Sequence, residues 1–120
     1  MSPTVYKILH IFGIVMAFVA LGGLTMQSLL GNDDRRGRKL VGIAHGVALV
    51  IILISGFGLM AKLGYGYTHL WFYLKLGIWL LVGGLIALIR RMPGRAGLFW
   101  WSLPVLGAFA AWVAFMKPGL

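Results

Sequence analysis

Four long apolar segments, separated by short polar stretches, make up this chain. The first segment is the clearest, because residues 8–32 contain no Lys, Arg, Asp or Glu. An α-helix needs about 20 apolar residues to cross the roughly 30 Å hydrocarbon core of a bilayer. The pattern therefore predicts four membrane-spanning helices, at residues 5–29, 40–61, 69–90 and 97–117.

The connections between these helices are short and polar. In the first, residues 31–39, Asp33 and Asp34 stand beside Arg35 and Arg36, which predicts weak local ion pairs in water. Short connections make neighbouring helices antiparallel. We therefore expect an all-α fold: an integral membrane four-helix bundle with up-down-up-down topology, forming a single domain over residues 1–120.

Composition supports the membrane class. Hydrophobic residues make up 61% of the chain and charged residues 11%, whereas soluble domains carry about 25% charged residues. The absence of cysteine excludes disulfides, iron–sulfur clusters and c-type haem attachment. The net charge of +9 is concentrated at the ends of the apolar runs, which favours the lipid bilayer, and not nucleic acid, as the partner.

The distribution of basic residues predicts the orientation of the bundle. Cytoplasmic connections carry an excess of Lys and Arg. The first and third connections hold Arg35, Arg36, Arg38, Lys39, Arg90, Arg91 and Arg95, and the opposite face holds only Lys7, Lys62 and Lys117. A multi-pass protein with both termini on the non-cytoplasmic side is the expected arrangement.

Three ionisable residues, Lys75, His10 and His45, lie well inside predicted helices, and such residues are candidates for a functional site. Lys75 and His10 both lie roughly 8–9 Å below the outer end of their helices, from a rise of 1.5 Å per residue. They could share a site there, together with His69 at the helix end. His45 is expected roughly 15 Å away in depth, towards the inner end.

Each candidate has an alternative interpretation. His10 could be a ligand or proton carrier, or an interfacial histidine bonded to water or a carbonyl. Lys75 could be functional or could extend to the headgroups. His45 could ligate haem or form a helix-to-helix hydrogen bond, and His69 fits an ordinary loop histidine. No Asp or Glu lies in a predicted helix, which argues against carboxylate chemistry and leaves Tyr73 as the other polar candidate.

Short motifs follow one another along almost the whole chain. They are Tyr6-Lys7-Ile8-Leu9-His10-Ile11, the Arg35-Arg36 loop leading to Gly56-Phe57-Gly58-Leu59, Trp71 with Lys75-Leu76, Pro104, and Lys117-Pro118. In order and spacing they resemble the HemJ family, the four-helix membrane protoporphyrinogen oxidases of many bacteria. They also resemble the CopD-like and SirB-like small membrane proteins.

The resemblance implies a protein of the bacterial inner membrane with haem b bound near His10 and a functional Lys75. The resemblance makes His10 and Lys75 both catalytic and cofactor-binding residues. His10 would ligate the haem iron, and Lys75 would orient a propionate or a substrate carboxylate. His45 is a possible further ligand in a position where the family has no histidine. Tyr73 stands where the family has a histidine.

Three functions are therefore open. The leading hypothesis is a haem-b redox protein of the HemJ-like and CopD-like group, with oxidoreductase activity as one candidate role. The second is a non-catalytic subunit or assembly factor, in a homo-oligomer or larger membrane complex, because glycines such as Gly42 and Gly46 suit close contact between helices. A copper or metabolite transporter is less favoured, since the chain lacks a Met-x-x-Met or Cys cluster.

Overall fold

A computed structural model describes residues 2–66 and 68–117 of the chain. Among these residues the secondary structure is entirely helical, which confirms the all-α fold class. The helices are α1 (Pro3–Leu29), α2 (Arg35–Leu63), α3 (Leu70–Arg91) and α4 (Ala96–Met116), with a single 3-10 turn, η1 (Pro93–Arg95), before α4. All four long helices are long and apolar enough to cross a membrane.

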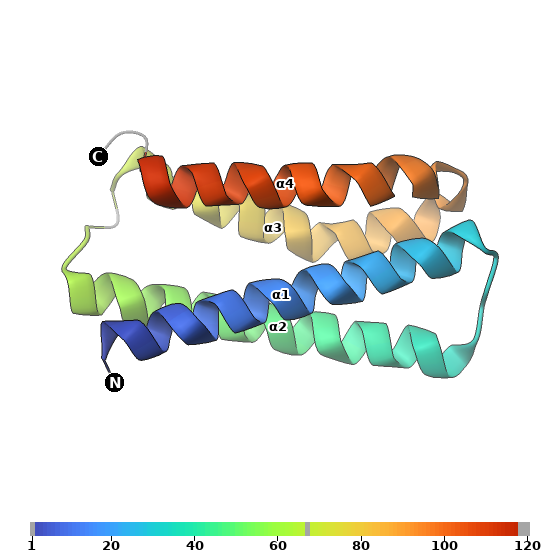
Figure 1. The fold of residues 1–120 in the computed structure, drawn as a ribbon, viewed down its shortest axis with the longest axis horizontal. Helices are drawn as coiled ribbons and strands as arrows, with labels where there is room; N and C mark the ends of the chain where they lie inside the picture. Colours follow the sequence, from blue (N-terminus) through green and yellow to red (C-terminus); the bar gives the residue numbers. More distant parts are fainter. Residues whose placement is uncertain (1, 67, 118–120) are drawn as a thin grey trace.

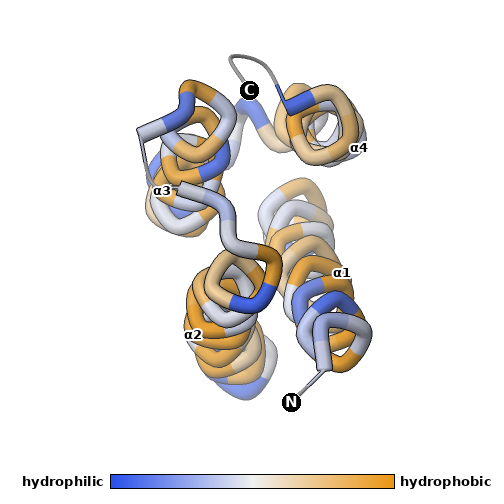
Figure 2. Tube along the Cα trace, turned by 90° about the vertical axis from the view of Figure 1, so that its left-hand side faces the viewer, coloured by the Kyte–Doolittle hydropathy of each residue, from blue (hydrophilic) through white to orange (hydrophobic). Residues whose placement is uncertain are grey.

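The helices form an elongated bundle with two different ends (Figure 1). One end, here called the basic end, carries the α1–α2 and α3–α4 connections. The other, here called the terminal end, carries the start of α1, the α2–α3 connection and the end of α4. Figure 2 shows apolar colouring on all four helices, and α1 packs most extensively against α2.

The second helix begins earlier than expected. It starts at Arg35, whereas the sequence pattern predicted a polar turn up to residue 39 and a helix from residue 40. Asp34 caps this helix, because its side chain accepts a hydrogen bond from the backbone N–H of Arg36 at 2.9 Å. Arg and Lys are good helix formers, so the charged stretch continues the helix into the polar region. At the other end Gly64 ends α2 in the left-handed conformation, with φ 73°.

A close approach of α1 to α2 determines the packing of this pair. A Cβ atom added to Gly13 would lie 2.9 Å from Cγ1 of Ile52 and 3.2 Å from the backbone oxygen of Ala48. Such short separations leave no room for a side chain, so the glycine allows the two backbones to come together. The buried residues Leu21 and Leu24 continue this interface towards the basic end.

Large apolar side chains cover the outside of the bundle. The exposed fraction is 72% for Trp101, 84% for Phe115 and 69% for Val19. A soluble monomer rarely exposes extended apolar surface of this kind, whereas hydrocarbon chains would solvate it favourably. The surface is therefore compatible with a lipid bilayer around all four helices.

Aromatic side chains gather at the terminal end. The rings of Tyr65 and Trp71 meet edge to face at 5.4 Å, and those of Phe72 and Tyr73 at 5.6 Å. The ammonium group of Lys117 lies 5.7 Å from the centre of the Tyr65 ring. Pro118 of the Lys117-Pro118 motif lies outside the described residues.

Candidate functional site

The His10 side chain bridges α1 and α2 at the terminal end. Its Nδ1 atom lies 3.1 Å from the backbone oxygen of Ile52 and 3.0 Å from Oγ of Ser55. A Cβ atom at Gly56 would lie 3.3 Å from Cε1 of the ring, so the absence of a side chain there makes room for the imidazole. These contacts hold the ring against α2 in one position.

The same contacts indicate which nitrogen of His10 carries the proton. The Ser55 hydroxyl donates to the backbone oxygen of Ile51 at 2.6 Å, so its oxygen is available as an acceptor. The oxygen of Ile52 can only accept. Both neighbours of Nδ1 are thus acceptors, and a proton on Nδ1 satisfies them. Nε2 then carries a lone pair, and among the described residues it has no hydrogen-bond partner.

A second close contact lies one turn nearer the terminal end. A Cβ atom at Gly58 would overlap the ring of Tyr6, which lies directly over this glycine. Gly56 and Gly58 therefore give the two ring side chains of α1, His10 and Tyr6, direct access to the α2 backbone. The sequence motif around these glycines is explained by this packing between helices.

Lys75 of α3 is half-buried at the same end. Within residues 2–66 and 68–117, its Nζ forms neither a hydrogen bond nor an ion pair. Lys117 follows α4 and places a second cation at this end of the bundle. Both acidic residues of the chain, Asp33 and Asp34, lie beyond the other end of the bundle. This region could therefore accept an anionic group.

His45 has a different environment and a different partner. Its side chain is only 4% exposed, and its Nε2 lies 2.9 Å from the backbone oxygen of Val82 in α3. Nearby, Nε1 of Trp79 donates to the backbone oxygen of Leu49 at 3.0 Å. The first of these hydrogen bonds is donated from α2 to α3, and the second from α3 to α2. His45 thus makes the helix-to-helix hydrogen bond that was one of its two expected roles.

The structure does not bring His45 together with His10. His10 bonds to Ser55, and Ser55 is separated from His45 on α2 by about 15 Å along the helix axis at 1.5 Å per residue. The remaining histidine, His69, precedes α3, and its side chain makes no capping hydrogen bond. His10 and His45 each have one ring nitrogen held by hydrogen bonds, but His45 is buried whereas His10 is only partly buried, so His10 is better placed to meet a ligand.

Of two polar residues at this end of the bundle, Ser55 was not singled out from the sequence, whereas Trp71 was noted only as part of a motif. Ser55 is 2% exposed and orients His10; its only signal in the sequence is a hydroxyl in an apolar run. Trp71 is 5% exposed, and its Nε1 is buried without a hydrogen-bond partner among the described residues. The contacts of both depend on how the helices are placed beside each other.

The arrangement limits the kinds of chemistry that the side chains can support. Within the described part of the chain, no group of three His, Asp or Glu side chains comes close enough to hold a metal ion. Among those described residues, the terminal end instead offers the free Nε2 of His10, the unpaired ammonium group of Lys75 and several aromatic rings.

No protein-family model matches this sequence, and no curated protein or solved structure matches it either.

Proposed function

We propose that this chain is a multi-pass protein of the bacterial inner membrane, with up-down-up-down helices and both termini on the non-cytoplasmic side. Four apolar helices, outward-facing apolar side chains and the collection of Arg and Lys at the basic end support this orientation. In this placement His10 and Lys75 lie in the outer leaflet.

We further propose that the terminal end binds haem b and that the protein has a redox function, as in the HemJ-like and CopD-like proteins that its sequence resembles. The observation that carries this proposal is the orientation of His10 by Ile52 and Ser55. Histidines that ligate a metal nearly always donate the other ring N–H to a carbonyl or similar acceptor. His10 has this arrangement on Nδ1, and its Nε2 fits the role of an axial ligand.

Lys75 supplies the second part of the proposed site. Its ammonium group has no anionic partner among the described residues and would bind a carboxylate, either a haem propionate or a carboxylate of the substrate. A bound haem would supply one-electron transfer. His45 has no ligand role in this proposal, because its side chain is only 4% exposed and lies packed between α2 and α3. If the activity follows the resemblance, the substrate is protoporphyrinogen.

The absorbance spectrum of the detergent-purified protein tests the haem site. Protein produced with a haem precursor should show the Soret and α bands of a b-type haem after dithionite reduction. His10→Ala should lose these bands, whereas the matched control His45→Ala should keep them. Ser55→Ala should retain haem with a shifted reduction potential, because the orienting hydrogen bond is altered.

Three results would contradict the proposal. Absence of haem in the unaltered protein would exclude the redox function. Loss of the bands in His45→Ala alone would transfer the ligand to α2. Equal loss in both variants, with normal far-UV circular dichroism, would contradict the assignment of the haem iron to His10 without a contribution from His45.

A non-catalytic membrane subunit is the second candidate, and one observation favours it. An apolar groove lies between α3 and α4, and it includes Leu85, Phe99, Leu103 and Leu106. α4 buries few of its own side chains, so a helix of a partner protein could pack there. Purification in mild detergent followed by size determination would reveal a stable partner, and a haem-free monodisperse complex would favour this function over the redox one.

A further inference from the structure

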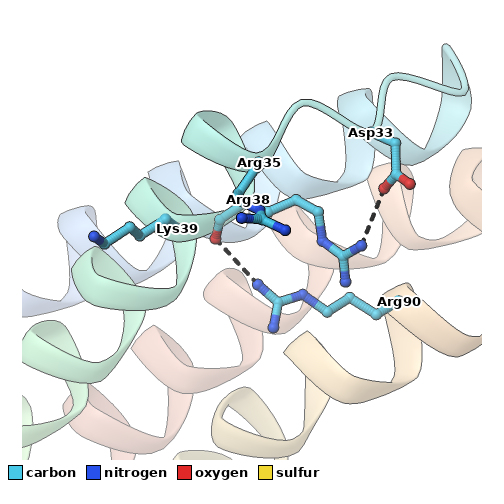
Figure 3. Close-up of a pocket in the computed structure, with 5 residues that line it drawn as sticks. All are labelled: Asp33, Arg35, Arg38, Lys39 and Arg90. Carbon is cyan, nitrogen blue, oxygen red and sulfur yellow. Dashed lines mark hydrogen bonds and ion pairs between the residues drawn. The ribbon is translucent and has the colours of Figure 1, made fainter.

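The basic end contains an open groove between the start of α2 and the end of α3. It is lined by Asp33, Arg35, Arg38, Lys39 and Arg90 and has a volume of about 530 Å³, within the range of small-molecule sites (Figure 3). The groove lies at the opposite end of the bundle from His10. Its lining is almost entirely charged, unlike the apolar surface along the helices.

The two helices are joined here by an unusual contact. The guanidinium of Arg90 reaches from α3 and donates to the backbone oxygen of Arg38 in α2 at 3.2 Å (Figure 3). A Cβ atom at Gly42 would lie 3.7 Å from the same guanidinium nitrogen, so this glycine leaves the path of Arg90 open. The bond holds a cation against the groove without neutralising its charge.

The charges of the groove do not balance. The carboxylate of Asp33 is engaged by Arg38 at 3.0 Å, and this is the ion pair of the lining. Arg35, Lys39 and Arg90 have no carboxylate partner among the described residues. Four cations against one anion leave a net charge of +3. Because like charges this close repel one another, an external anion would stabilise the groove.

We propose that this groove binds the phosphate of an anionic phospholipid headgroup. Arginine guanidinium groups form paired hydrogen bonds to phosphate oxygens, and basic pockets between membrane helices bind such headgroups. The neighbouring residues indicate a lipid as the source of the phosphate. Leu40 and Ile43 follow Lys39 on α2 and are 69% and 56% exposed, so apolar surface for acyl chains adjoins the charged groove.

This site rests on the membrane placement of the helices and is independent of haem binding at the terminal end. Loss of headgroup binding would leave the haem spectrum unchanged, and loss of haem would leave headgroup binding unchanged. The two proposals can therefore fail separately.

Lipid-dependent thermal stability of the full-length protein in a neutral detergent provides the test. Unfolding is followed by tryptophan fluorescence during titration with phosphatidylglycerol, with phosphatidylcholine and inorganic phosphate as separate titrations. We expect a rise in the midpoint temperature with phosphatidylglycerol alone. The double variant Lys39→Gln/Arg90→Gln should need roughly 25-fold more lipid, from about fivefold for each charge near the membrane surface.

The matched control is Arg91→Gln/Arg95→Gln, which removes two exposed cations from the same end without altering the groove. It should respond to phosphatidylglycerol as the unaltered protein does. Equal weakening in both double variants would overturn the proposal, since only general surface charge would then matter. A stabilisation by phosphatidylcholine or inorganic phosphate that matches phosphatidylglycerol would overturn the lipid assignment.

A single variant keeps the test valid if the double variant does not fold. Lys39 makes no ion pair among the described residues, so Lys39→Gln should fold normally and weaken the lipid response about fivefold. An unchanged response in this variant would also contradict the proposal.

Discussion

Replacement of His45 tests the hydrogen bond that joins α2 to α3. His45→Leu removes the donor to the Val82 oxygen and retains an apolar side chain of similar bulk in a site that is 4% exposed. His45→Gln is the matched variant, because its amide N–H₂ can still donate to the same oxygen. The pair separates loss of the hydrogen bond from loss of packing.

The size of the effect follows from the environment of the carbonyl. Hydrogen bonds between membrane helices contribute about 0.6 kcal/mol on average and at most about 1.7 kcal/mol. The oxygen of Val82 keeps its bond within α3 after the substitution, since it lies inside a regular helix. The Val82 oxygen is therefore not left without a hydrogen-bond donor. We therefore expect His45→Leu to lower the free energy of unfolding by about 1 kcal/mol, and His45→Gln to lower it by less.

Titration with sodium dodecyl sulfate from mild detergent, followed by far-UV circular dichroism, measures this free energy. A decrease in His45→Leu that His45→Gln partly restores would support the hydrogen-bonding role. Equal stability of His45→Leu and the unaltered protein would refute it. Unchanged stability together with lost haem bands would show that His45 acts as a ligand, contrary to the geometry with Val82.

Two further predictions concern α1 and the start of α2. Gly13→Leu should lower the free energy of unfolding by roughly 1–3 kcal/mol in the same titration, because the new side chain would collide with Ile52. Gly22→Leu is the control, since a Cβ atom there meets nothing within 4 Å; equal loss in both would contradict the packing argument. The hydrogen bonds from Arg36 hold the pKa of Asp34 below its ordinary value, so the cap exists at neutral pH and is lost as the pH falls through that lowered pKa. Asp34→Ala should therefore increase amide exchange in the first turn of α2 at neutral pH, and unchanged exchange would refute the capping role.

The number and kind of helices were accessible from the sequence, because each apolar run has the length of a membrane span. The start of α2 was not. The charged residues after Asp34 fit a solvated turn equally well. The helix start is shown by the hydrogen bonds that Asp34 accepts from the backbone N–H groups of Arg36 and Arg38. Hydropathy reports where a segment is apolar, and a helix that extends into water continues beyond that limit.

The candidate site was predictable in part. An imidazole or ammonium group inside an apolar run is conspicuous, so His10 and Lys75 could be selected from the sequence alone. The bond from His10 to Ser55 joins residues 45 positions apart and depends on the close crossing of α1 and α2. The contact of Arg90 with the Arg38 carbonyl likewise joins distant segments, and its acceptor is a backbone atom that every residue possesses. Neither partner leaves a distinct sequence pattern.

The extensive pairing of α1 with α2 has a consequence for biosynthesis. Every hydrogen bond and close contact that orients His10 comes from residues 51–56, so these contacts can form once the first helical hairpin has been translated. Domains and their parts fold in order from the N-terminus during synthesis. In the proposed membrane placement, this hairpin would leave the translocon with its histidine already held in place, and α3 would then bring Lys75 to the same end.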